Sequence, residues 1–137
     1  NSSFKLNVAE ISLPQLFEQI RQDLPEYDLN TESKKEIVIY GDPHRLRDAL
    51  TCLLQHLSTL SGLNSMHLIT TEKENHIEIS ITNHPTEQFD LLEDEPESNP
   101  LAIAKTLIEM HKGKINTARN EQTGNFCFYI SLPLTTP

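Results

Sequence analysis

Several residue types are scarce in this sequence of 137 residues, which has four glycines, two cysteines and no tryptophan. Two cysteines are too few for the disulfide framework of a small secreted domain. Both fall within expected regular elements, as reduced cysteines commonly do, although a pair between Cys52 and Cys127 stays an open alternative. No apolar run approaches the ~18 residues of a membrane span, and the start lacks the basic and apolar stretches of a secretory signal. We therefore expect a cytoplasmic fragment of a longer chain, without direct membrane contact, and leave membrane anchorage of the parent chain open.

Basic residues are also scarce: the chain has eleven Lys and Arg but twenty Asp and Glu, which gives a net charge of −9. Binding to a nucleic-acid backbone needs clustered Lys and Arg, so this partner is not expected. The excess is concentrated in residues 85–99, called the acidic loop below, while the rest of the chain has fourteen acids and eleven bases. Its six acids are Glu87, Asp90, Glu93, Asp94, Glu95 and Glu97. Such a loop is either a solvated segment or a binding element.

Three segments have the apolar spacing of helices that pack on a core. The strongest is a continuous aliphatic stripe that ends at Ser61-Gly62. Its members are Leu46, Ala49, Leu50, Leu53, Leu54, Leu57 and Leu60. An earlier helix is expected to begin at Ser12-Leu13-Pro14 and to end at Pro25. A later helix is expected from Pro100 to the stop at His111-Lys112-Gly113.

Short runs of apolar or alternating residues predict the strands. They lie at 4–8, 27–30, 37–40, 66–70, 77–81, 114–119 and 126–132, the last two forming a hairpin around residues 122–124. Together these elements predict one domain over residues 1–137. Its expected fold class is α/β (α+β), a two-layer sandwich with about three helices on one face of a mixed, roughly five-stranded sheet.

Three strings in the right order are similar to stretches of the catalytic ATP-binding domain of sensor histidine kinases, in the GHKL ATPase superfamily. VIYGDPHRL at 38–46 resembles the segment that leads into the family's asparagine-box helix. The stretch 101–115, with LAIAK at its start and EMHKGKI at its end, resembles the part after the second glycine box. FCFYISLPL at 126–134 resembles the family's closing strand. The resemblance covers nearly the whole chain and implies this fold.

The resemblance also implies that the asparagine box has changed. The family has two asparagines four residues apart, and the second helps to hold Mg²⁺ against the triphosphate. Cys52 and His56 occupy these places here. A thiol is a poor ligand for a hard cation that prefers oxygen, and an imidazole is little better. The Lys or Arg that the family often has one turn later corresponds to Thr59, so we expect no magnesium site and no catalytic residue.

The glycine boxes are altered as well. Asn83 stands at the family's adenine-binding Asp, and His84-Pro85 replaces the glycine-containing turn that follows it. Pro100 stands where glycines would let backbone N–H groups approach phosphates, and proline has no N–H. The acidic loop takes the place of the ATP lid, where its charges would repel a triphosphate. The four glycines lie at 41, 62, 113 and 124, so residues 63–112 contain none. We expect no bound ATP.

These features favour a non-catalytic ATPase-like domain of a bacterial sensor or phosphorelay protein, without cofactor or metal. It would dock a response-regulator receiver domain or another phosphorelay domain, as the resemblance to Rcs-type phosphotransfer intermediates implies. Side chains such as Phe89, Leu91 or Leu92 folded into the space between the 46–60 helix and the acidic loop would indicate a closed site.

Two alternatives stay open. The first is an active kinase domain in which Asn83 and Asn99 retain reduced roles. The second is a metal- or redox-responsive module that uses Cys52 and His56, which share one helix face with Asp48. The other histidines, at 44, 67, 76, 84 and 111, have no ligand spacing and are expected at the surface or in helix caps.

Overall fold

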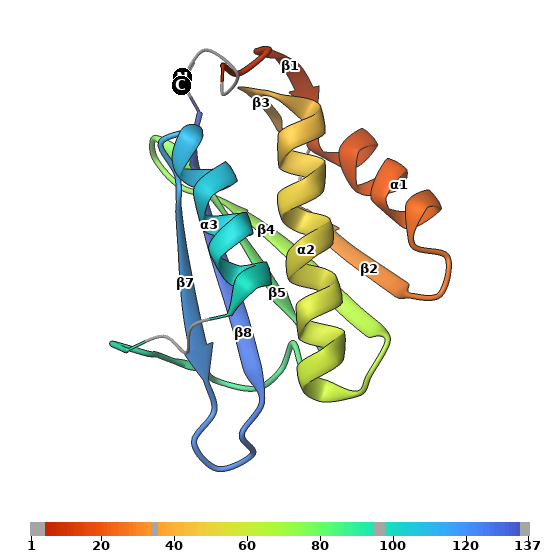
Figure 1. Ribbon diagram of the computed structural model, residues 1–137, viewed down its shortest axis with the longest axis vertical. Helices are drawn as coiled ribbons and strands as arrows, with labels where there is room; N and C mark the ends of the chain where they lie inside the picture. Colours follow the sequence, from red (N-terminus) through yellow and green to blue (C-terminus); the bar gives the residue numbers. More distant parts are fainter. Residues whose placement is uncertain (1–4, 34–35, 95–97, 135–137) are drawn as a thin grey trace.

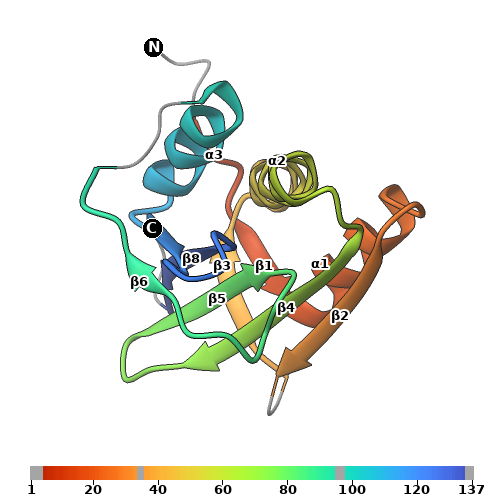
Figure 2. The same ribbon diagram turned by 90° about the horizontal axis from the view of Figure 1, so that it is seen from below.

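The computed structural model describes residues 5–33, 36–94 and 98–134, and within them the chain forms two layers (Figure 1). The helices of this part of the chain are α1 (Leu13–Asp23), α2 (Pro43–Ser61) and α3 (Asn99–Met110). All three cover the same face of the main sheet (Figure 2). The predicted fold class is therefore confirmed. No helix among the described residues has both the length and the apolar content needed to cross a membrane.

Among the described residues, the main sheet has six strands in the order β2-β4-β5-β8-β7-β6. They are β2 (Asp28–Ser33), β4 (Ser65–Glu72), β5 (His76–Thr82), β6 (Asp90–Leu91), β7 (Lys114–Arg119) and β8 (Phe126–Pro133). β2 and β4 are parallel and the other neighbours are antiparallel, so the sheet is mixed as predicted. β6 was not predicted, because its two residues lie in the acidic loop and have no alternating apolar pattern.

A separate antiparallel ribbon joins β1 (Ala9–Ser12) to β3 (Val38–Gly41). The first strand was expected at residues 4–8, and this expectation is wrong for the described residues 5–8, which precede the strand. The register explains the shift, because Ile11 pairs with Ile39 and both side chains are buried in the core. Val8, which belonged to the expected strand, is 46% exposed.

The helix boundaries agree with the capping signals in the sequence. Ser12 accepts a hydrogen bond from the N–H of Gln15 at the start of α1, and Ser98 accepts one from Leu101 at the start of α3. Asp42 caps α2 in the same way. Gly62 ends α2 in the left-handed conformation, with a φ of 74°, which glycine adopts without the usual steric cost. The predicted helix stop at Gly62 is thus confirmed.

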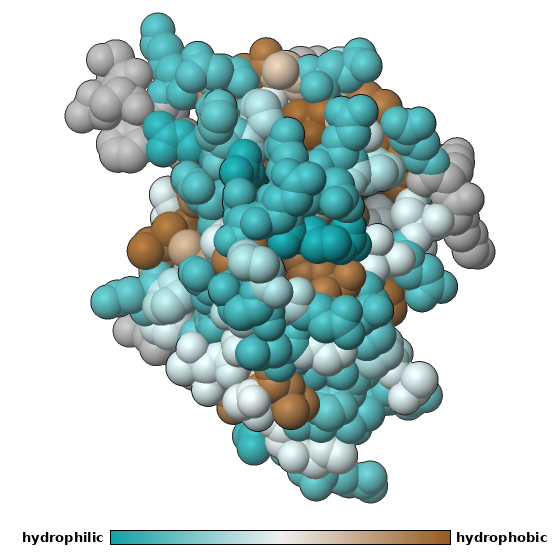
Figure 3. All heavy atoms as spheres, turned by 90° about the vertical axis from the view of Figure 1, so that its right-hand side faces the viewer, coloured by the Kyte–Doolittle hydropathy of each residue, from teal (hydrophilic) through white to brown (hydrophobic). Residues whose placement is uncertain are grey.

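The hydrophobic core lies between the helices and the main sheet. The aliphatic stripe of α2 is buried from Leu46 to Leu57, and each such side chain stabilises the fold by about 1.5–3 kcal/mol relative to exposure. The stripe ends one turn earlier than predicted, because Leu60 is 47% exposed. Ile77, Ile79 and Ile81 of β5 provide much of the opposing surface. On the side of α1 and β2 the surface is mostly hydrophilic, with separate hydrophobic spots (Figure 3).

Candidate functional site

The candidate site lies where α2 and α3 pack side by side on the sheet (Figure 2). Asp48, Cys52 and His56 follow one another at four-residue spacing and therefore share one face of α2. His56 reaches the first turn of α3, so this face is directed toward that helix. The predicted positions Cys52 and His56 thus belong to the seam between the two helices.

The His56 side chain of α2 contacts residues of two other elements, β8 and the start of α3. Its ring stacks on the ring of Phe128 in β8, with centroids 5.9 Å apart and an angle of 24° between the planes. Its Nε2 lies 3.4 Å from Oγ of Ser98, the residue that caps α3. Burial lowers the pKa of His56, because the charged imidazolium loses solvation. The neutral ring therefore joins α2 to the start of α3.

The two cysteines are free thiols and do not form a disulfide. Cys52 is half-buried, and burial together with the charge of Asp48 raises its pKa. Cys127 is buried in β8, and burial raises its pKa to about 11, so it remains protonated near neutral pH. Within residues 5–33, 36–94 and 98–134, no three His, Cys, Asp or Glu side chains are grouped to hold a metal ion.

Thr59 and Asn83 are both engaged within the fold. Thr59 is exposed near the end of α2, and its hydroxyl donates to the carbonyl of Gln55 in the same helix (3.0 Å). Asn83 is buried just after β5, and its Nδ2 donates to the carbonyl oxygen of Ser65 at 2.8 Å. The same nitrogen lies 3.3 Å from Sδ of Met66. The amide of Asn83 therefore fastens the end of β5 to the start of β4.

The first turn of α3 is capped from within the chain. Pro100 lies in this turn and contributes no N–H group. The N–H of Leu101 donates to Oγ of Ser98 (3.3 Å), and the N–H of Ala102 donates to the carbonyl of the same serine (3.0 Å). The bond of Ala102 is the first regular bond of the helix, so one of the free backbone donors at this helix start, that of Leu101, is already used.

The front half of the acidic loop lies at the far edge of the sheet. The carboxylate of Glu87 accepts hydrogen bonds from Thr123 (3.0 Å) and Asn125 (2.9 Å) of the β7–β8 turn. Asn120 donates to the carbonyl of Gln88, and Asp90 then pairs with Arg119 as β6 joins β7. These bonds tie residues 87–91 to the β7–β8 hairpin. Glu87 and Asp90 thus belong to the edge of the sheet formed by β6 and β7.

The apolar side chains of the acidic loop do not all fill the site. Leu91 is 62% exposed, so it does not close the space beside α2. Leu92 is half-buried and lines a groove on the β7 side of α3. Direct packing of α3 on α2, with His56 against Ser98, occupies the seam instead. Glu95 and Glu97 lie outside the described residues.

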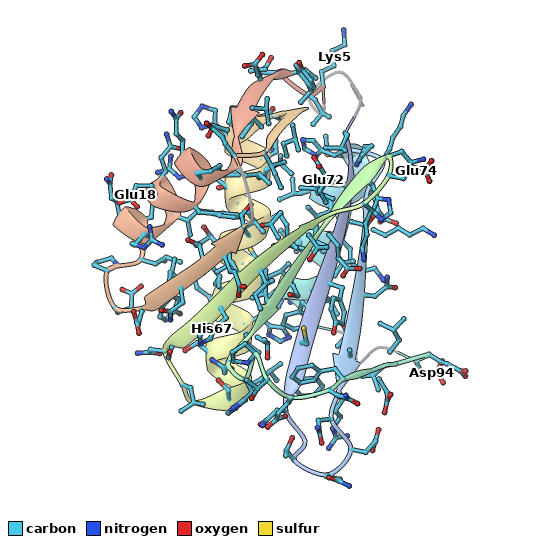
Figure 4. All side chains as sticks on the ribbon, turned by 180° about the vertical axis from the view of Figure 1, so that it is seen from behind. Lys5, Glu18, His67, Glu72, Glu74 and Asp94 are labelled. Atoms are coloured by element: carbon cyan, nitrogen blue, oxygen red, sulfur yellow. The ribbon has the colours of Figure 1, made fainter. Side chains whose placement is uncertain are left out.

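The groove beside α3 has a volume of about 820 Å³ and is open to solvent. Glu93, Asp94 and Lys105 contribute its charged groups, and Leu101 and Ile115 contribute apolar surface. Asp94 lies at the tip of the segment that projects from the sheet edge (Figure 4). Asn99, named above as a possible nucleotide ligand, also lines this groove. Ser98, which contacts His56, lines the groove too, so the groove reaches the start of α3.

Comparison with known proteins finds no matching family model and no matching curated protein. Solved structures do match. The catalytic domain of histidine kinase ThkA superposes with a TM-score of 0.75 and 18% identity, over 96% of this chain and 99% of that one. The ATP-binding domain of PrrB from Mycobacterium tuberculosis gives 0.70 and 16%, over 96% and 98%. This chain has the fold of a histidine-kinase catalytic domain. ThkA in complex with the response regulator TrrA also matches, with a TM-score of 0.75, 19% identity, and 98% and 44% coverage.

The helix on which the resemblance predicts the asparagine-box positions is α2. Cys52, His56 and Thr59 lie on the predicted helix α2, Pro100 lies on the predicted helix α3, and Asn83 directly follows the predicted strand β5. His111 was expected at the surface or in a cap, and its burial was not predicted. His111 does cap α3, but it is 1% exposed. Its position between the apolar α3 face and Gly113 was the available signal for burial.

Proposed function

We propose that this chain is a non-catalytic histidine-kinase-type domain of a bacterial sensor or phosphorelay protein, and that it no longer holds ATP. The observation that carries the proposal is the position of His56. It occupies the second asparagine-box place, yet it stacks on Phe128 and contacts Ser98 at the start of α3. An oxygen ligand for Mg²⁺ is replaced by a half-buried neutral ring, and α3 lies directly against it.

The remaining nucleotide positions support the same proposal. Asn83 uses its amide on β4, so reading an adenine would first require breaking the bond to Ser65. The start of α3 has Pro100 in place of a glycine and already bonds the Leu101 amide to Ser98. Asp94 adds negative charge beside this helix start, which disfavours a polyphosphate.

We further propose that the domain docks a response-regulator receiver domain in the cytoplasm, as in Rcs-type phosphorelays. The fold supports this role, because the similar ThkA kinase was solved together with the response regulator TrrA. A domain that keeps the fold while its nucleotide positions are used for internal contacts retains its outer surfaces for a partner. Fold likeness alone does not name the partner, so binding has to be measured.

Thermal unfolding with and without Mg-ATP tests the nucleotide part of this proposal. A ligand present at 100 times its dissociation constant stabilises a protein by about 2.7 kcal/mol. We expect no shift for this chain, and the ATP-binding domain of PrrB provides a reference under identical conditions. A clear stabilisation by Mg-ATP, absent with Mg²⁺ alone, would instead establish the active-kinase alternative.

Calorimetric titration with the cognate receiver domain tests the docking part separately. We expect saturable binding that does not depend on Mg-ATP. A receiver domain from an unrelated phosphorelay is the matched control for nonspecific association, which a net charge of −9 would otherwise favour with any basic protein. Equal heats from the two receivers, or none from either, would refute docking while leaving the nucleotide result intact.

A further inference from the structure

The carboxylate of Asp42 binds two separate segments of the chain. Asp42 lies between β3 and α2 and is only 2% exposed. Its Oδ1 accepts the N–H groups of His44 (3.1 Å) and Arg45 (3.2 Å), which are in the first turn of α2. Its Oδ2 accepts the N–H of Asn7 (2.9 Å), in the incoming chain before β1. One carboxylate thus fixes both the start of α2 and the position of the incoming chain.

The backbone of Asp42 is bonded to the end of α3. Its N–H donates to Nε2 of His111 at 3.0 Å. Nδ1 of the same ring lies 2.8 Å from the carbonyl of Leu107, and a carbonyl can only accept, so Nδ1 carries the hydrogen. A Cβ at Gly41 would lie 2.7 Å from Cδ2 of His111, which shows how closely the ring packs here. A shift of the incoming chain cannot be absorbed by a void at this point.

The two ends of α3 are held with unequal strength. At the C-terminal end, the 3.0 Å bond from Asp42 to His111 links the helix to the end of β3, and Gly113 lies so close to the carbonyl of Ser131 that no Cβ would fit. At the N-terminal end, the contact from Ser98 to α2 is 3.4 Å long, near the limit for a hydrogen bond. α3 has twelve residues. Such a helix is about 18 Å long, so a tilt of about 5° at its C-terminal end moves its start by about 1.5 Å.

We propose that Asp42 and His111 form a joint through which the position of residues 5–8 sets the tilt of α3, and thereby the His56–Ser98 contact. The bonds run without interruption from Asn7 through Asp42 to His111. The C-terminal end of α3 stays in place when the helix tilts, and the His56–Ser98 contact at its N-terminal end is the contact that opens. This device does not depend on whether the domain binds a receiver or a nucleotide.

The two free cysteines provide a reporter and its internal control. Cys52 is half-buried one turn before His56 on the same face of α2, so opening of the seam exposes its thiol. Cys127 is buried on β8 and reacts only when the domain unfolds more widely. Alkylation by iodoacetamide at fixed pH, with each cysteine quantified by mass spectrometry, separates local opening from global unfolding.

Two variants break the Asn7–Asp42 bond from opposite sides. Asn7→Pro removes the N–H donor and leaves Asp42 intact. Asp42→Asn keeps one carbonyl oxygen to cap α2, for which Asn is as good as Asp, but presents an NH₂ group to Asn7. Asp28→Asn removes the same charge at the exposed start of β2 and is the matched control. Ser98→Ala removes both the contact to His56 and the side-chain cap of α3, so it gives an upper limit for the rise in Cys52 reactivity.

Asn7→Pro and Asp42→Asn are each expected to raise the alkylation rate of Cys52 by about threefold to tenfold. The alkylation rate of Cys127 should stay as in the wild type. Asp28→Asn should change neither rate. The proposal is overturned if Cys52 reacts at the wild-type rate in both variants while amide exchange at residue 7 of the Asp42→Asn protein confirms that the bond is lost. It is equally overturned if the two cysteines accelerate together, because the bond would then support only global stability.

Discussion

Substitution of Gly41 by alanine tests the close packing of β3 against α3. The new Cβ would lie 2.7 Å from Cδ2 and 3.0 Å from Nε2 of His111, and 3.1 Å from Cδ1 of Leu46. Real Cβ contacts are not this short, so the His111 ring has to move. Overpacking of this kind costs about 1–3 kcal/mol, and a buried Asp42 N–H that loses its acceptor adds about 1–3 kcal/mol. We expect the free energy of unfolding to fall by about 2–4 kcal/mol. A small part of the cost is offset, because alanine lowers the conformational entropy of the unfolded chain relative to glycine.

Gly62→Ala is the matched control for Gly41→Ala. Gly62 has a φ of 74° and no atom within 4 Å of the position of a Cβ, so its substitution costs about 1 kcal/mol through the backbone alone. Urea unfolding measures both variants, with an unchanged denaturant slope as the sign of an unchanged fold. In a His111→Ala background the cost of Gly41→Ala should fall below about 1 kcal/mol, because the clash is gone. A Gly41→Ala protein no less stable than Gly62→Ala would refute the packing argument.

Three further outcomes follow from single residues. Thr70 is 5% exposed and its hydroxyl has no hydrogen-bond partner among the described residues, so Thr70→Val should stabilise the protein by about 1 kcal/mol in urea unfolding. Lys112 has a φ of 60°, a conformation that costs less for glycine than for lysine. Lys112→Gly should therefore raise the free energy of unfolding by about 0.5–1 kcal/mol in the same assay, and a decrease would contradict this argument. Burial alone would raise the pKa of Asp42, but the N–H groups of Asn7, Arg45 and His44 outweigh it and hold the pKa below 3.8. The resulting stability is present above pH 3.8 and is lost as the pH falls further, so the wild type and Asp42→Asn should converge at acid pH; a constant difference from pH 2 to 7 would exclude this linkage.

The sequence was sufficient for the elements that depend on local pattern. The stripe of α2 and its stop at Gly62 follow from helical periodicity and from the conformational freedom of glycine, and the structure has both. The strand near residue 4 was misplaced because alternation alone does not fix pairing, which here depends on Ile11 meeting Ile39. β6 was missed because its pairing with Arg119 and Ala118 uses the backbone and needs no apolar pattern.

For the candidate site, the sequence predicts the positions of the residues but not the contacts that they make. Cys52 and His56 were assigned to one helix face from their spacing, and they lie there. The contacts that define His56 involve Phe128 and Ser98, which are distant in sequence and meet it only through the tertiary fold. The burial of His111 likewise depends on Gly41, a residue from another element that leaves room for the ring. Long-range packing of this kind leaves no periodic signal.

Calorimetric titration of the purified domain with Mg-ATP tests the central claim most directly. The seam contains His56 against Phe128 and Ser98, and we propose that His56 stands where an ATP-binding domain would have an oxygen ligand for Mg²⁺. The expected result is the absence of saturable heat up to about 1 mM nucleotide, equivalent to a binding free energy weaker than about −4 kcal/mol. Saturable binding with a micromolar dissociation constant that requires Mg²⁺ would contradict the account.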